Sequence, residues 1–272
     1  MSVKREPSGR RSIQVEVEVP GTPEEVWRAI ATGQGVSCWF VPAEIDEKAG
    51  TVSLHFGPGM DSSSSMTAWE PPHRFAASGG DFAPGAPAMA TEWIVEARSG
   101  GTCVVRVVHS LFADTDDWDN QLTDVESGWP TFFHVLRLYL AHHRGQRCAP
   151  VQLMAMTPQP IGEAWASFSR AVGLAGAKQG DRRAIQPEGL PQLSGVVEQE
   201  AGDKNNVIYR IEGPVPGVAV FMAHDCGGPT MIAVNLYLYG EGAQAVAARD
   251  EPLWQGWLSR LFPAPVNEDP VA

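Results

Sequence analysis

The order in which strand and helix patterns follow one another is the feature that most restricts how this chain can fold. Residues 13–19 alternate apolar and polar side chains, which indicates a strand with one buried face. Helix signals follow at 22–30, strand and turn signals fill 43–112, and a long amphipathic helix comes next. The same order returns after residue 150. An order of elements that occurs twice predicts two copies of one kind of domain.

The signals at the start of the first helix are specific. Thr22 can cap the helix, Pro23 suits its first position, and Glu25 completes a T-x-x-E capping box. Trp27 then lies on the apolar stripe of that helix. A second helix signal, at 160–171, again follows a strand pattern. The two helices therefore support the duplication.

Each copy closes with a long helix. The first closing helix has one wide apolar face, which carries Trp129, Phe132, Phe133, Leu136, Tyr139 and Leu140. Pro130 cannot donate a hydrogen bond to the preceding turn, so we expect this helix to kink or restart there. The acidic segment 114–117 is expected to open it. The second closing helix, at 243–261, repeats the apolar spacing and contains Pro252 in a similar place.

Strand patterns in the second half are shorter and less regular. They occur at 151–156, 193–198, 207–212, 218–223 and 231–239. We therefore predict an α+β fold of two tandem domains, at 12–146 and 150–264, each a curved antiparallel sheet around a long C-terminal helix. The polar segment 144–150 is predicted to link them.

Three other segments are predicted to be irregular. The one basic cluster is expected in a disordered N-terminal tail and consists of Lys4, Arg5, Arg10 and Arg11. The four consecutive serines at 62–65 are expected in a polar loop, and residues 79–87 form a loop rich in Gly, Pro and Ala.

Charge and hydropathy exclude several classes of function. The net charge of −12 argues against a nucleic-acid partner and against an anionic membrane surface, since both require clustered positive charge. No apolar run suits a secretory signal or a membrane span. Four scattered cysteines fit free thiols in a reducing compartment, so we expect a cytoplasmic protein.

The residues that commonly hold metals or perform catalysis form no convincing pattern. The seven histidines make no H-x-H or H-x-x-x-H pair, and the acidic segment before residue 119 lacks the central glycine of a calcium loop. Cys226 lies beside His224 and Asp225, but the Gly-Gly-Pro that follows indicates a hairpin turn. We therefore assign no metal site, no cofactor and no catalytic residue.

The order and spacing of four segments resemble a known superfamily. The segments are the opening strand, residues 22–27 at the start of the first helix, Trp39-Phe40 after it, and Gly128-Trp129 with Phe133 and Leu136 in the closing helix. Over residues 12–145 the chain resembles the START-like SRPBCC superfamily, in the branch of homologues of the activator of the heat-shock-protein-90 ATPase. The second half resembles a divergent copy that lacks the Trp39-Phe40 pair.

The resemblance implies a helix-grip fold with a cavity between the closing helix and the sheet, and it implies no universal catalytic residue. Members of the superfamily bind or process hydrophobic small molecules, or serve as partners of chaperones. The residues that we expect to line such a cavity and bind a ligand are Trp39, Phe56, Trp69, Trp93, His109, Phe112, Trp129, Phe133 and Leu136. His109 is expected on the same strand face as Val105 and Val107.

Three functions follow as hypotheses. The leading one is binding of an apolar small molecule, in a stress-related role and without catalysis. The second is a polyketide cyclase/dehydratase-like or hydrolase-like enzyme that uses His109 or another polar group of the cavity as acid or base. The third is a protein partner of a chaperone, acting through its surface. The sequence leaves enzymatic activity, the identity of the ligand and the oligomeric state open.

Overall fold

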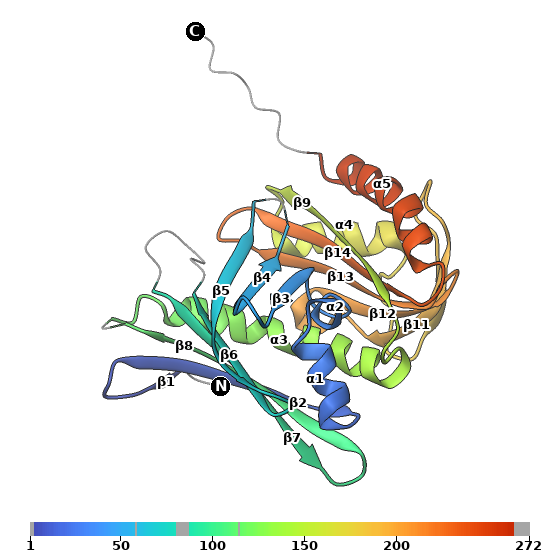
Figure 1. The fold of residues 1–272 in the computed structure, drawn as a ribbon. Coiled ribbons are helices and arrows are strands. Elements are labelled where there is room, and N and C mark those ends of the chain that lie inside the picture. Colours follow the sequence, from blue (N-terminus) through green and yellow to red (C-terminus); the bar gives the residue numbers. More distant parts are fainter. Residues whose placement is uncertain (1–2, 58, 80–86, 114, 264–272) are drawn as a thin grey trace. The chain divides into compact units, whose positions relative to one another are not determined.

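The computed structural model of the protein describes residues 3–57, 59–79, 87–113 and 115–263 (Figure 1). The chain divides into two compact units, Met1–Gln146 and Arg147–Ala272. Each unit contains one antiparallel sheet and its own helices. The predicted α+β fold of two tandem domains is confirmed.

The first domain is built on eight strands in the order β1-β2-β8-β7-β6-β5-β4-β3. The strands are β1 Lys4–Arg5, β2 Arg10–Pro20, β3 Ala43–Asp46, β4 Thr51–His55, β5 Asp61–Glu70, β6 Arg74–Gly79, β7 Met89–Arg98 and β8 Thr102–Phe112. Its helices are α1 Pro23–Ile30, α2 Gly33–Val36 and α3 Asp119–His142. Strands β3 to β8 form the meander that the patterns at 43–112 predict.

The second domain has six strands in the order β10-β11-β12-β13-β14-β9. They are β9 Cys148–Thr157, β10 Arg182–Ile185, β11 Leu193–Gln199, β12 Asn206–Gly213, β13 Gly217–Asp225 and β14 Thr230–Tyr239. The helices are α4 Ile161–Val172, the 3-10 turn η1 Gly202–Lys204 and α5 Ala243–Leu261. Five of these strands match the predicted segments, whereas β10 was not predicted.

Helix α1 begins as its sequence predicts. The backbone N–H of Glu25 donates to the hydroxyl of Thr22 at 3.4 Å, and the N–H of Thr22 donates to the carboxylate of Glu25 at 2.9 Å. These two bonds satisfy N–H groups that a helix start leaves unpaired. The helix buries Val26, Trp27 and Ile30.

Helix α3 runs without a break through Pro130, so the alternative that the helix restarts there is wrong. Pro130 is exposed, while Trp129 and Phe133 are buried. The proline ring therefore meets solvent, and the apolar face of the helix remains intact. Burial of several large side chains can offset a lost helical hydrogen bond, which costs about 3 kcal/mol at an interior proline.

Two predictions are wrong at the N-terminal end of the first domain, namely the start of the closing helix and the disorder of the basic segment. The helix begins at Asp119 rather than within 114–117, and residue 114 lies outside the described residues. The guanidinium of Arg11 donates to Asp116 and Asp119 at 2.7 Å each, and Arg5 donates to Asp119 at 2.5 Å. Strand β1 pairs with β2, so the basic cluster lies in a hairpin and not in a disordered tail. Neutralisation by the carboxylates stabilises this hairpin against α3.

The run of serines at 62–65 lies in strand β5, which corrects the predicted loop. Ser64 pairs with Val52 on one side and with Gly79 on the other. Serine has little preference for strands, but a ladder of hydrogen bonds to two neighbouring strands outweighs propensity. Of the predicted loop at 79–87, Gly79 belongs to β6 and residues 80–86 lie outside the described residues.

The second domain has its own hydrophobic core. Helices α4 and α5 lie against one face of its sheet. The ring of Phe168 in α4 is tilted against those of Phe221 in β13 and Trp257 in α5, with centroids 6.2 and 6.1 Å apart. Alternate residues of β13 and β14 point into this core. Within the described ranges, none of the helices is long and apolar enough to cross a membrane.

A prediction concerns the close approach of α2 to α1. We expect Gly35→Ala to destabilise the first domain by about 1–3 kcal/mol, because overpacked sites cost this much. A Cβ at Gly35 would lie 2.0 Å from the carbonyl oxygen of Arg28. Urea unfolding followed by tryptophan fluorescence measures the change. In the matched control, Gly128→Ala in α3, a Cβ meets no described atom within 4 Å, and we expect no loss. Equal losses in both variants would contradict this account.

Candidate functional site

Strand register identifies the face of the first sheet that α3 covers. His109 pairs with Thr91, Thr91 with Ala77, and Ala77 with Met66. Directly paired residues of antiparallel strands point to the same side. The ring of His109 stacks on Trp129 of α3, with centroids 5.5 Å apart. We call this side of the sheet the inner face.

Trp129 is the centre of an aromatic cluster on the inner face. Its ring lies 5.2 Å from each of Phe40, Trp93 and Phe133, and 6.5 Å from Trp39. Of the predicted ligand residues, the structure brings together Trp39, Trp93, His109, Trp129 and Phe133. All five are buried, as is Leu136. The middle of the predicted cavity is therefore filled by rings in mutual contact.

His109 has a defined tautomer. Its Nε2 lies 2.8 Å from Nε1 of Trp129, and because an indole nitrogen only donates, Nε2 must be the acceptor. The proton of the neutral ring is then on Nδ1, which donates to the hydroxyl of Thr91 at 3.0 Å. Burial lowers the pKa of His109 to about 4. At neutral pH the imidazole is uncharged and both nitrogens are in use, so it is not poised to act as a base.

Trp39 and Phe40 connect the small helices to the cluster. The indole N–H of Trp39 donates to the carbonyl of Ala29 at 2.9 Å, and its ring stacks on Phe40. Phe40 in turn contacts Phe56 at 5.8 Å and Phe132 at 4.7 Å. Phe56 and Phe132 are half-buried. The cluster thus ends in two partly exposed rings.

Trp69 lies on another side of the cluster. Its ring contacts Trp27 at 5.0 Å and Phe75 at 5.8 Å, and the residue is half-buried. The indole nitrogen itself is buried and has no hydrogen-bond partner among the described residues. The edge-on contact with the Trp27 ring stabilises the pair without a conventional acceptor.

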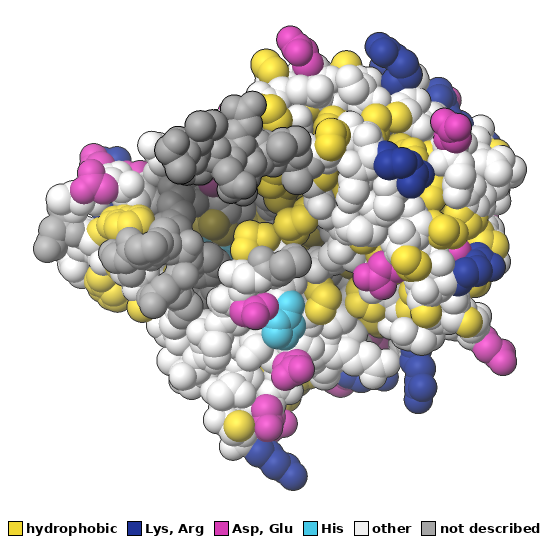
Figure 2. All heavy atoms as spheres, turned by 90° about the horizontal axis from the view of Figure 1, so that it is seen from above, with side chains coloured by type: hydrophobic (Ala, Val, Ile, Leu, Met, Phe, Trp, Pro, Cys, Tyr) yellow, Lys and Arg dark blue, Asp and Glu magenta, His cyan; other side chains and the backbone are white. Residues whose placement is uncertain are grey.

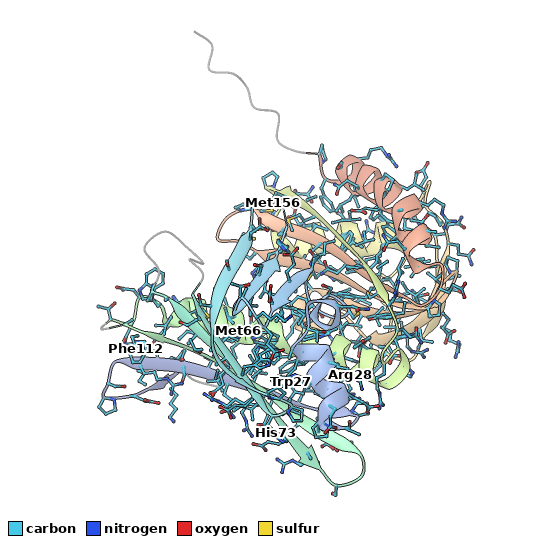
Figure 3. All side chains as sticks on the ribbon, viewed as in Figure 1. Trp27, Arg28, Met66, His73, Phe112 and Met156 are labelled. Carbon is cyan, nitrogen blue, oxygen red and sulfur yellow. The ribbon has the colours of Figure 1, made fainter. Side chains whose placement is uncertain are left out.

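The prediction that Phe112 lines the cavity is wrong. The side chain is 65% exposed, and its cross-strand partner is Arg10. Its neighbour Leu111 is buried, so strand alternation sends Phe112 to the opposite face. Figure 3 shows it at the end of β8, away from Trp27.

Part of the inner face is not fully covered. Ser62, Ser64 and Met66 of β5 alternate with exposed residues and are half-buried, and so is Thr91 of β7. On β2 and β8, by contrast, Ile13 and Val107 of the same face are buried. We call these four half-buried residues the open strip. It combines a thioether with three hydroxyls beside the aromatic cluster, which suits an apolar molecule that has a few polar atoms.

Sequence reasoning missed two contributors to this site. Thr91 was not singled out, although it lies two residues before Trp93 and strand alternation places both on one face. Met66 lies within the strand and turn patterns at 43–112, which indicate no particular role for it. The alternation of apolar and polar residues shows on which face Thr91 and Met66 lie. It does not show which residues lie beside them, because that depends on the register between strands.

A polar groove of about 450 Å³ also occurs in the first domain, outside the aromatic cluster. Its lining includes Lys4, Arg10, Gln14, Glu92, Arg106 and Glu126. Arg106 forms ion pairs with Glu16 and Glu96. Since acidic partners already offset the arginine charge, the groove offers little attraction for an anion. Figure 2 likewise shows acidic and basic side chains interspersed on the face that it displays.

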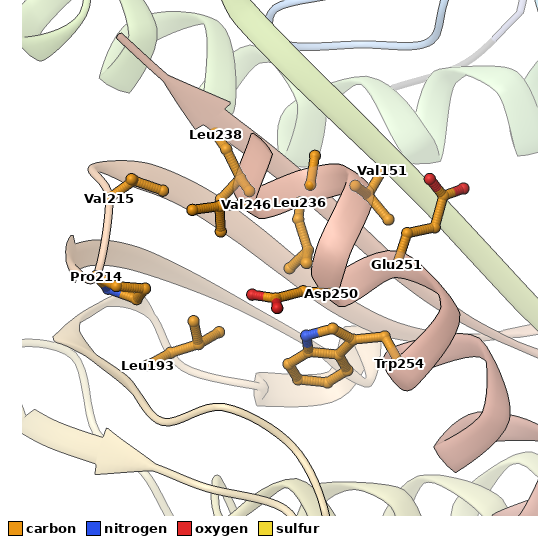
Figure 4. A pocket seen from close by; sticks show the side chains of 11 residues that line it. Val151, Leu193, Pro214, Val215, Leu236, Leu238, Val246, Asp250, Glu251 and Trp254 are labelled. Carbon is orange, nitrogen blue, oxygen red and sulfur yellow. The ribbon is translucent and has the colours of Figure 1, made fainter. Parts of the chain in front are cut away.

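A small pocket of the second domain lies between α5 and its sheet. Figure 4 shows Asp250 and Trp254 of α5 directed between Leu193 and Leu236. The free space is about 10 Å³, which is room for about one water molecule. The second sheet and its helix are therefore packed almost completely at this point.

A comparison with known families finds a match within the first domain. Residues 20–141 match the family described as Activator of Hsp90 ATPase homolog 1-like protein. None of the curated proteins matches the chain significantly.

Several solved structures are similar to the chain. CalU16 from Micromonospora echinospora is 21% identical with a TM-score of 0.41, and the match covers 52% of this chain and 83% of CalU16. The di-domain ARO/CYC BexL from the BE-7585A biosynthetic pathway is 15% identical with a TM-score of 0.45, over 93% and 99% of the two chains. The Aha1 dimer from Colwellia psychrerythraea is 20% identical with a TM-score of 0.39, over 49% and 98%.

We expect His109 to make the stability of the first domain depend on pH. Its pKa is about 4 in the folded chain and about 6.5 when unfolded, so between these values the unfolded chain binds the extra proton. The stabilisation is complete above about pH 6.5 and decreases as pH falls toward 4, by about 2 kcal/mol at pH 5. Urea unfolding at pH 7.5 and 5 measures this loss. His109→Gln is the control, since its amide does not titrate, and an equal loss in both proteins would refute the assignment.

Proposed function

We propose that the first domain, which matches the family of Activator of Hsp90 ATPase homolog 1-like proteins, binds an apolar small molecule on the open strip of its inner face. The observation that carries the proposal is the half-buried state of Ser64, Met66 and Thr91, which lie on the same face as the buried aromatic cluster. A concave sheet face beside a packed aromatic cluster is a common setting for such ligands.

The hydroxyl of Thr91 provides a polar anchor. Its oxygen accepts the Nδ1 proton of His109, so its own proton is left to donate to another acceptor. A ligand oxygen at this point would complete a chain from Trp129 through His109 and Thr91. We therefore expect a ligand with an apolar body and a carbonyl or hydroxyl oxygen.

The size of the strip limits the affinity. Burying about 200 Å² of apolar ligand surface contributes roughly 5 kcal/mol before the costs of association. One or two hydrogen bonds add about 1 kcal/mol each. The sum corresponds to micromolar binding at best.

The other two hypotheses fit the geometry less well. An enzyme that uses His109 as a base would have to break the bond from Trp129 and protonate a group whose pKa is about 4. A chaperone partner would act through the surface, where Phe112 is exposed, but single exposed apolar residues are common.

Two adjacent serines provide a matched pair of variants to test the proposal. Ser64→Arg places a bulky cation on the inner face, whereas Ser65→Arg places it on the exposed opposite face. We expect flavonoids, polyketides or fatty acids to quench tryptophan fluorescence and raise the melting temperature of the natural protein. Ser64→Arg should weaken the response at least about tenfold, because an unpaired charge is costly to bury. Ser65→Arg should leave it unchanged.

Two results would count against ligand binding on the strip. One is the absence of a response to every class of compound, which would leave the chaperone-partner hypothesis ahead. The other is equal binding by both arginine variants, which would move the site away from the open strip.

A further inference from the structure

The second sheet carries a concentration of methionines on the face that points away from α4 and α5. Phe221, Ala223 and Ile232 point into the domain core, so residues 222, 224, 231 and 233 point to the other side. On β9, Leu153 is in the core and residues 154 and 156 are on that other side. This face therefore bears Met154, Met156, Met222 and Met231, which are half of the eight methionines of the chain.

Strand register arranges these residues in two parallel rows. One row runs across three strands from His224 to Met231 and then to Met156. The next row runs from Met222 to Ala233 and then to Met154. Neighbouring strands are about 4.8 Å apart, so side chains in one row are within reach of each other. We call the four methionines and His224 the methionine patch.

The patch is accessible to solvent. His224 is exposed, Met156 is 39% exposed, and Met154, Met222 and Met231 are half-buried. Figure 3 shows Met156 near the end of β9. Met has three rotatable bonds beyond Cα, so its sulfur can adjust its position at small cost.

Thioether sulfur is a soft ligand and favours soft cations. Sites of methionine with an imidazole suit Cu(I), whereas carboxylate oxygens suit magnesium and calcium. Among the described residues, no three His, Cys, Asp or Glu side chains gather as a metal site would require. Methionine thioethers are a different set of metal ligands from these four residue types.

We propose that the methionine patch binds one Cu(I) ion through the imidazole of His224 and the sulfurs of Met231 and Met156. The three residues lie in one row, with Met231 paired to both of the others. Met222 and Met154 flank the short side chain of Ala233 in the adjacent row. They place two further thioethers beside the proposed site.

Cys226 is close to the patch and requires its own control. It lies two residues after His224, and its sulfur is 4.0 Å from the carbonyl oxygen of His224. A cysteine thiolate is also a soft ligand that binds Cu(I). A Cys226→Ser protein separates thiol binding from thioether binding.

The first experiment identifies the ligands directly. The full chain is labelled with [methyl-13C]methionine and titrated with Cu(I) under nitrogen with ascorbate. We expect the methyl resonances of Met156 and Met231 to shift until one equivalent is bound, while those of Met60 and Met66 in the first domain do not. Assignment uses single Met→Leu variants, which remove sulfur and nearly conserve volume.

The second experiment measures affinity by competition with bicinchoninate. Met156→Leu with Met231→Leu, and separately His224→Gln, should weaken binding at least about tenfold, since even outer-shell changes at metal sites cost about 10- to 100-fold. Met60→Leu and Cys226→Ser should bind as the natural protein does. Unchanged affinity in the double variant would overturn the proposal. So would loss of binding in Cys226→Ser alone, which would indicate a thiol site.

Discussion

The hydrogen bond from Trp129 to His109 is the interaction on which the first domain depends. It joins the centre of the closing helix to the middle of the sheet, and the ring of Trp129 also contacts Phe40, Trp93 and Phe133. The bond requires a neutral imidazole with its proton on Nδ1, and burial provides that state by lowering the pKa. The contact with Trp129 thus fixes the tautomer of His109, and burial fixes its charge.

The inner face has two regions, the packed aromatic cluster around Trp129 and the half-buried open strip. Rings fill the space around Trp129, whereas Ser64, Met66 and Thr91 remain half-buried. Thr91 connects the two regions because it accepts a hydrogen bond from His109. The open strip is therefore adjacent to the packed aromatic cluster, and a ligand there would not need to displace its rings.

The two domains repeat one plan but use different surfaces. The first domain has its candidate site on the face covered by its closing helix. In the second, the space beside Trp254 is reduced to about 10 Å³, and the soft side chains lie on the opposite face of the sheet, around Met231. The order of elements is common to both domains because each must bury its own sheet face.

The sequence by itself determined the local elements and their order. The capping box at Thr22 and the apolar faces of α3 and α5 are short-range patterns that appear where they were predicted, and so do most of the strands, although β10 and the serine run of β5 were not predicted as strands. The tertiary structure alone decided what lies across the sheet. It placed the basic residues of β1 and β2 against Asp119, turned Phe112 outward, and set Met231 between His224 and Met156. The physical reason is that the two-residue alternation along a strand shows which face a side chain is on, whereas only the register between strands shows which side chains lie beside it.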